Sequence, residues 1–219
     1  MLDKLIVLVE EPSMEMALEQ LLPRMLAGAD FQIIRFQCKD DLLKNLPNRL
    51  RGYSQWLPVN WAILVLVDQD DDDCRALKQA MEKVAADARL LSKTRAGHGK
   101  PFQVANRIAV EELEAWFFGD WTAVQAAYPR VPATQVSKQG FRDPDAVLGG
   151  TWEALQRVLQ KAGYFKTGLR KMECARHVAQ HMDPARNASR TLSGFCWRGG
   201  PCRRLGLMAV PHRPEGHAP

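Results

Sequence analysis

The chain has 219 residues, of which 46% are apolar and 25% charged, an ordinary composition for one soluble globular domain and too short for two large ones. Its longest apolar runs have the length of a strand, which excludes a transmembrane protein, and its start does not have the form of a secretory signal. The net charge is +5. The five cysteines are irregularly spaced and form no CxxC pair, which argues against a disulfide framework and a structural zinc site. We therefore expect a cytoplasmic protein that does not act at a membrane.

Apolar runs of strand length recur along the first half of the chain, and residues with helical periodicity separate them. The predicted strands are residues 4–9, 31–36, 61–67 and 104–110. Strands that alternate with helices at this spacing favour a mostly parallel sheet with right-handed crossovers. The sequence therefore predicts the α/β fold class, with helices flanking the sheet.

The helices between these strands are predicted from apolar residues that repeat every three or four positions. The first covers residues 18–26 and stops at Gly28, and the second covers 42–50 and is disturbed by Pro47. The third presents one apolar face, made of Leu77, Ala80, Met81, Val84, Ala88 and Leu91. A further helix is expected to begin near residues 111–118, with Trp116, Phe117 and Phe118 in the core.

From about residue 121 the pattern becomes helical and irregular, and residues 152–162 and 170–182 give the better helices. We expect a core at 1–120, a helical extension of the same domain at 121–192, and an irregular basic tail at 193–219. From residue 186 onward there are six arginines and one acid, which accounts for the whole net charge of +5. This basic end either binds nucleic acid phosphates or is a solvated, irregular end of the chain.

Acidic residues follow three of the four predicted strands. Glu10 and Glu11 end the first strand, and Asp68 and Asp70 end the third. The acids after the fourth strand are Glu111, Glu112 and Glu114. The carboxyl ends of parallel strands meet at one edge of a sheet, so we expect these groups to converge there. Ionised carboxylates placed this close need a cation between them, and their hard oxygen ligands suit Mg²⁺ or Mn²⁺.

Several of these acids also have a purely structural explanation. Asp71, Asp72 and Asp73 precede a helix, where acids act as caps and interact favourably with the helix dipole. Glu111 and Glu112 could be acids of a first helical turn. Glu15 and Glu19 fall on a solvated helix face, although Glu15 is close enough in sequence to support Glu10. Glu10, Asp68 and Asp70 directly follow buried strands and favour a functional site.

Three segments together resemble a known family. These are Val9-Glu-Glu-Pro-Ser-Met-Glu15, then Val67-Asp-Gln-Asp70, then the stretch from Arg107 to Asp120 with its Glu-Leu-Glu-Ala-Trp motif. They look like a TOPRIM-type domain and, within that group, like the bacterial family DUF4276, whose C-terminal motif is similar to residues 182–190. The resemblance covers about residues 4–192.

The resemblance implies a catalytic core shared with topoisomerases, primases and OLD-type nucleases. By this resemblance, Glu10 is the strand-end glutamate, Asp68 and Asp70 are the DxD pair, and Glu114, then Glu111, are further acids near the metals. Many TOPRIM proteins have glycine after the first glutamate. Glu11 occupies that place here, so it is either an additional metal ligand or a sign of altered activity.

Basic residues outside the acidic group are candidates for contacts with a nucleic acid backbone. His98 and Lys100 lie in a basic loop before the fourth strand, where a histidine is either a phosphate contact or a solvated residue. Further candidates in the second half are Lys138, Arg142, Lys166, Arg170 and Lys171. The alternative for this second group is a solvated surface.

Three functions compete at this stage. The leading hypothesis is a metal-dependent nuclease acting on DNA or RNA, with Mg²⁺ or Mn²⁺ as cofactor. The resemblance to OLD-type proteins, together with the absence of a Walker-type loop, implies a separately encoded ATPase partner in a defence-type module, and a homo-oligomer is conceivable. The second is a non-catalytic TOPRIM-like subunit that binds a partner protein or a nucleotide. The third, a phospho-receiver domain, expects a lysine at the end of the fourth strand, which is not found here.

Overall fold

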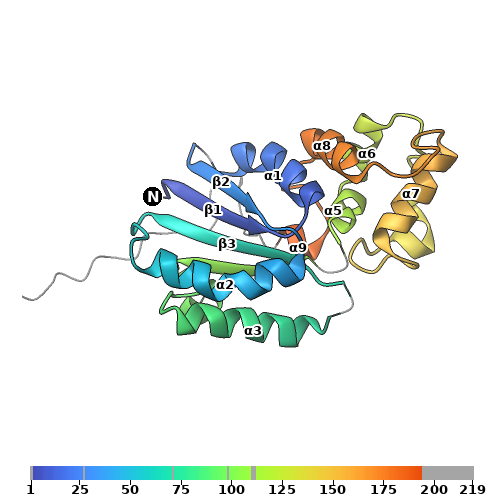
Figure 1. Cartoon of the computed structure of the whole chain (residues 1–219). Helices are drawn as coiled ribbons and strands as arrows, with labels where there is room; N and C mark the ends of the chain where they lie inside the picture. The colour runs from blue at the N-terminus through green and yellow to red at the C-terminus, as the bar shows by residue number, and fades with distance from the viewer. Residues whose placement is uncertain (1, 27, 71, 98, 110–111, 194–219) are drawn as a thin grey trace, which may run out of the picture.

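The computed structural model describes residues 2–26, 28–70, 72–97, 99–109 and 112–193 (Figure 1). Within these residues, a parallel four-stranded sheet consists of β1 (Lys4–Val9), β2 (Asp30–Arg35), β3 (Trp61–Asp68) and β4 (Val104–Ala109). The strand order is β2-β1-β3-β4, which confirms the α/β class and the parallel sheet. The continuous apolar runs lie in the two central strands, because each of these is buried on both faces.

Helices cover both faces of this sheet and create two layers of core. One face packs against α2 (Lys39–Ser54) and α3 (Cys74–Asp87), and the other packs against α1 (Pro12–Met25). The short helix α4 (Lys93–Ala96) precedes β4. Each strand therefore sends alternate side chains into different cores, as the two-residue period of a strand requires.

The C-terminal helices gather beside α1 and beyond the carboxyl ends of the strands (Figure 1). They are α5 (Glu114–Gly119), α6 (Trp121–Ala127), α7 (Thr151–Lys161), α8 (Lys171–His181) and α9 (Arg190–Ser193), with 3₁₀ turns at Gln135–Ser137 and Gln139–Phe141. Helix α8 packs along α1 and α6, so this part shares the core of the sheet. Among the described residues, no helix is both long enough and apolar enough to cross a membrane.

Two helices differ from their predicted form. Helix α2 continues through Pro47 to Ser54, because Leu42, Leu46 and Leu50 on its inner face are buried and this packing outweighs the lost hydrogen bond. Helix α3 ends at Asp87, and Arg89 has a positive φ of 59°. This turn carries Leu90 into the core and leaves Leu91 37% exposed. Ala80 is also exposed, so the predicted apolar face was wrong at these two positions.

The C-terminal motif closes against α5 and α6. Asp120, whose side chain is fully buried, accepts two hydrogen bonds of 2.8 Å from Arg186 and one from the backbone N–H of Asp183. Asn187 donates to the carbonyl of Trp116 at 2.7 Å. The backbone passes so near Gly119 that a β-carbon there would lie 2.1 Å from the Asn187 side chain. These contacts therefore hold the C-terminal motif against α5 and the start of α6.

Candidate functional site

The candidate site lies at the carboxyl edge of the sheet, where neighbouring strands end together. Strand β1 pairs in parallel with β3, and Val9 lies opposite Leu66. Glu10 and Glu11 follow β1, while Asp68 is the last residue of β3. Helix α5 places Glu114 at its first position, shortly after β4. The topology therefore brings acids from three separate segments to one edge, as the sequence predicted.

Three of these carboxylates are buried. Glu10 is 8% exposed, Asp68 6% and Glu114 2%. A Glu10 carboxylate oxygen accepts a hydrogen bond from the backbone N–H of Asp68, which ties the ends of β1 and β3 together. Buried carboxylates require compensation for the water they have lost, so their surroundings are informative.

Burial and mutual repulsion favour the protonated form of these groups. Burial raises the pKa of Asp68 well above its usual range, and the neighbouring Glu11, Glu10, Glu114 and Asp70 raise it further. Burial likewise raises the pKa of Glu10 to about 7, opposed by the Asp68 N–H and by Lys39. The pKa of Glu114 is also raised to about 7, mainly by burial. The edge therefore holds a group of interacting acids centred on Asp68.

Asp68 carries the least compensated oxygen of this group. Its Oδ1 is buried and has no hydrogen-bond partner among the described residues. A buried acceptor without a partner is rare in folded proteins and indicates a proton, a water molecule or an ion at that position. The donor set is made of hard carboxylate oxygens, which fits Mg²⁺ or Mn²⁺.

Asp70 lies on the exposed side of this edge. It has a positive φ of 47°, and its carboxylate forms an ion pair of 2.6 Å with Lys39, the first residue of α2. Lys39 also contacts Asp72 at 2.9 Å and the carbonyl of Gln69 at 3.0 Å. These contacts fix the loop after β3 to α2, and they place one cation beside the acids.

A second lysine faces the acids from the C-terminal helices. Burial lowers the pKa of Lys171, but the Glu114, Glu11, Glu112 and Asp68 carboxylates outweigh burial and leave it raised. Lys171 also lies 3.8 Å from Glu112, whose carboxylate accepts from the Thr151 hydroxyl and the Trp152 N–H. Glu112 therefore caps the start of α7, and Lys171 keeps its charge next to the cluster.

The structural explanations hold for several other acids. Asp73 caps α3 by accepting from the Ala76 N–H at 2.7 Å. Glu15 forms an ion pair of 2.9 Å with Arg35, and Glu19 is exposed on α1. Glu11 accepts a hydrogen bond from the Ser13 hydroxyl and remains close enough to raise the pKa of Asp68. Asp71 and Glu111 lie outside the described residues.

The basic candidates fall at different places. Lys100 is exposed in the loop before β4, which is the amino end of the sheet, opposite to the acids. Lys138 is exposed and donates to Gln135 at 2.8 Å, and Lys166 is exposed between α7 and α8. His98 and the tail from residue 194 lie outside the described residues. Among the described residues proposed for backbone contacts, Lys171 is the one that lies beside the acids.

Sequence reasoning did not identify Lys39 and Lys171 as neighbours of the acids. Lys39 lies 29 positions before Asp68 and Lys171 lies 57 positions after Glu114, so only the packing of α2 and α8 brings them to this edge. In the described part of the chain, no three His, Cys, Asp or Glu side chains are arranged tightly enough to surround a metal ion. The predicted metal ligands Glu10, Glu11, Asp68, Asp70 and Glu114 therefore remain a prediction.

Comparisons with known proteins give one match. Neither the curated proteins nor the solved structures contain a significant match to this chain. The model of one family, described as a domain of unknown function, DUF4276, matches residues 9–197. The matched segment begins at the last residue of β1 and contains β2 to β4, the acidic edge and the C-terminal motif. The chain is a member of the DUF4276 family.

Proposed function

We propose that this protein is a metal-dependent hydrolase of phosphodiester bonds, a TOPRIM-like nuclease that acts on DNA or RNA with Mg²⁺ or Mn²⁺. The observation that carries the proposal is the buried Asp68, which has an unpartnered oxygen and four acidic neighbours. Folding such a group is unfavourable unless protons or cations neutralise it. Because these carboxylates ionise fully only when a cation neutralises them, they are suited to bind a cation.

The arrangement of the acids supports this chemistry. Asp68, Glu10 and Asp70 would hold the metal ions, and Glu114 and Glu11 lie near enough to contribute charge. A divalent cation bound there would activate water and offset the negative charge that develops on a phosphate. The order of these acids along the chain is also that of the TOPRIM resemblance.

The chain's own residues provide further parts of the proposed mechanism. Glu10 has a pKa of about 7, which suits a group that accepts a proton from water at neutral pH. Lys171 holds its proton and can donate a hydrogen bond to a phosphate oxygen at this edge. Lys39 forms a 2.6 Å ion pair with Asp70, and a metal ion bound by Asp70 would compete with this pair.

The resemblance to OLD-type proteins extends the proposal to a partner. A nuclease subunit without its own ATPase would work with a separately encoded ATPase in a defence-type module. A non-catalytic subunit that binds a partner or a nucleotide is the alternative if cleavage is absent.

Cleavage of labelled single- and double-stranded DNA and RNA tests the proposal, with and without the proposed ATPase partner. We expect cleavage with Mg²⁺ or Mn²⁺, none with chelator, and at least a hundredfold slower cleavage by Glu10→Gln and Asp68→Asn. Asp87→Asn is the control, because this exposed residue forms only a surface pair with Lys83. Wild-type rates in Glu10→Gln, or no cleavage under any condition, would contradict the proposal.

A further inference from the structure

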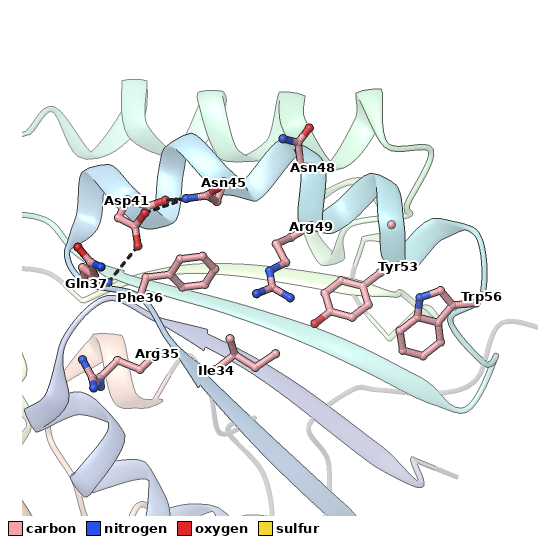
Figure 2. A pocket seen from close by; sticks show the side chains of 11 residues that line it. Ile34, Arg35, Phe36, Gln37, Asp41, Asn45, Asn48, Arg49, Tyr53 and Trp56 are labelled. Carbon is pink, nitrogen blue, oxygen red and sulfur yellow. Dashed lines mark hydrogen bonds between the residues drawn. The ribbon is translucent and has the colours of Figure 1, made fainter.

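A pocket lies outside the acidic edge, between the edge strand β2 and helix α2 (Figure 2). Its volume is about 650 Å³, which is within the range of small-molecule and nucleotide sites. We call it the β2–α2 groove. Its walls combine aromatic rings, amides and two arginines, and the groove residues used below are Arg35, Phe36, Asp41, Arg49, Tyr53 and Trp56.

Arg49 is the central charged group of the groove. Figure 2 shows its side chain reaching between Phe36 and Tyr53, and its guanidinium lies 5.9 Å from the centre of the Phe36 ring. Among the described residues, no carboxylate lies within ion-pair distance of Arg49. A guanidinium beside aromatic rings and without an acidic partner is suited to an anionic ligand.

The other charged groups of the groove already have partners. Asp41 accepts hydrogen bonds from the Asn45 amide at 2.8 Å and from the Gln37 N–H at 3.1 Å. Arg35 forms its ion pair with Glu15. Arg49 hydrogen-bonds the neutral Tyr53 side chain, so among the described residues its charge has no carboxylate partner and is available to an anionic ligand.

Aromatic side chains continue from Tyr53 to the end of α2. Trp56 packs edge-on against Tyr53 at 5.5 Å and against Trp61 at 5.9 Å between ring centres. Lys4 lies 4.9 Å from the centre of the Trp61 ring. Trp56 is 56% exposed, so much of its ring area is open to a ligand. Cations and aromatic rings that alternate along a groove are typical of surfaces that bind single-stranded nucleic acid.

The groove also connects with the acidic edge. Arg35 lies opposite Val9 in the sheet, and the Phe36 N–H donates to the Val9 carbonyl at 2.8 Å, one residue before Glu10. At the same end, Lys39 begins α2 and holds Asp70. The helix then runs back along the sheet to Tyr53 and Trp56. A chain lying in the groove would therefore have one end at the acids.

We propose that the β2–α2 groove binds single-stranded nucleic acid, with a base stacked on Trp56 and a phosphate at Arg49. This inference rests on the proposed function, because it assigns the surface along which a nucleic acid strand would reach the acidic edge. A peptide that added a strand to β2 would use the backbone of that edge and would have no need of a guanidinium without a carboxylate partner. A duplex hides the faces of its bases, so it would not use Trp56.

Binding is measured in chelator, where cleavage cannot interfere, as the fluorescence anisotropy of labelled dT and rU oligonucleotides with the full chain. We expect Trp56→Ala to weaken binding about 5- to 100-fold. Arg49→Gln should weaken binding and should also reduce the slope of log K against log salt by about 0.7. Arg51→Gln is the matched control, since Arg51 lies on the same helix, outside the lining of the groove, and its side chain donates hydrogen bonds to the Pro47 carbonyl and to Asn48.

Three results would overturn the groove proposal. These are no binding of either oligonucleotide, unchanged affinity in both variants, and a change of oligomeric state without a change in affinity, which would make the groove a protein interface. If the protein cleaves with metal while both variants bind normally, the proposed function is supported and the groove proposal is wrong. If the protein never cleaves but binds through Trp56 and Arg49, the groove proposal is supported and the proposed function is wrong.

Discussion

Burial and the neighbouring negative charges both disfavour the ionised carboxylate of Asp68. The residue closes a strand that is buried on both faces, and this position carries its carboxylate away from water. Four acidic neighbours then raise its pKa further. The sequence could indicate this residue because an acid directly after an apolar strand is unusual. It could not indicate the degree of burial, which depends on the C-terminal helices.

Glu114 should make the stability of the metal-free protein depend on pH. Its pKa is about 7 in the folded chain and 4.5 when unperturbed, so the folded state binds this proton more tightly. The stabilisation is complete below pH 4.5 and is lost as pH rises through 7. Since one pKa unit corresponds to about 1.4 kcal/mol, Glu114→Gln should raise the unfolding free energy by about 3 kcal/mol at pH 8.

Urea unfolding in chelator at pH 4.5 and pH 8 measures this effect. The variant and the wild type should differ little at the lower pH and clearly at the higher one. Equal differences at both pH values, or a less stable variant at pH 8, would show that folding does not raise the pKa of Glu114.

Lys39 should compete with metal for the carboxylate of Asp70. Its ammonium lies 2.6 Å from that carboxylate and also lowers the pKa of Glu10, so it reduces the negative potential of the site. Lys39→Gln should therefore bind Mn²⁺ several-fold more tightly than the wild type, as measured by calorimetry. Lys83→Gln, a lysine that pairs with Asp87 on the surface, should leave Mn²⁺ binding unchanged. Weaker binding by Lys39→Gln would instead mean that Lys39 positions Asp70.

At the scale of elements, the C-terminal motif acts as a fastening for α5, α6 and α9. The Ala188 N–H donates to the Gly119 carbonyl at 2.8 Å. Ser189 and the backbone of Arg190 donate to the buried Asp145 at 2.6 and 2.7 Å. These bonds join segments about 45 to 70 residues apart, so the motif stabilises the helices that bury Glu114.

Gly119→Ala should destabilise the fold by about 2–4 kcal/mol, because the new methyl group would lie 2.1 Å from the Asn187 oxygen and 2.8 Å from the Ser189 nitrogen. Asn187 would have to leave its bond to Trp116. Gly52→Ala is the matched control: a β-carbon at this helical position meets nothing within 4 Å, so it should be neutral or stabilise by up to about 1 kcal/mol. Thermal or urea unfolding compares the two, and equal effects would contradict the fastening role.

The regular elements were predictable because each has a strong local signal. The central strands β1 and β3 appear as uninterrupted apolar runs, and α1, α2 and α3 show helical periodicity. Local signals failed where the tertiary structure decides: Pro47 is accommodated within α2, and the turn at Arg89 exchanges Leu91 for Leu90. The short helices α5 and α6 bury Trp116 and Phe117, which the sequence predicted as core residues.

At the scale of the whole molecule, the parallel order of the sheet was enough to predict which acids meet. It could not predict which cations face them, because Lys39 and Lys171 arrive on helices from opposite sides of the sheet. The groove was equally hidden, since Phe36, Arg49 and Trp56 come together only through the packing of α2 on β2. Long-range packing therefore assembles both candidate sites.

The central claim is that the acids around Asp68 bind a divalent cation, and calorimetric titration with Mn²⁺ at pH 7.5 tests it most directly. The account predicts saturable binding with release of protons, because the pKa of Asp68 is raised well above its usual range and Glu10 and Glu114, with pKa values of about 7, are still partly protonated at this pH. Asp68→Asn with Asp70→Asn should abolish this binding, while Asp87→Asn should retain it. Identical Mn²⁺ binding by the wild type and the double variant, or no binding by either, would contradict the account.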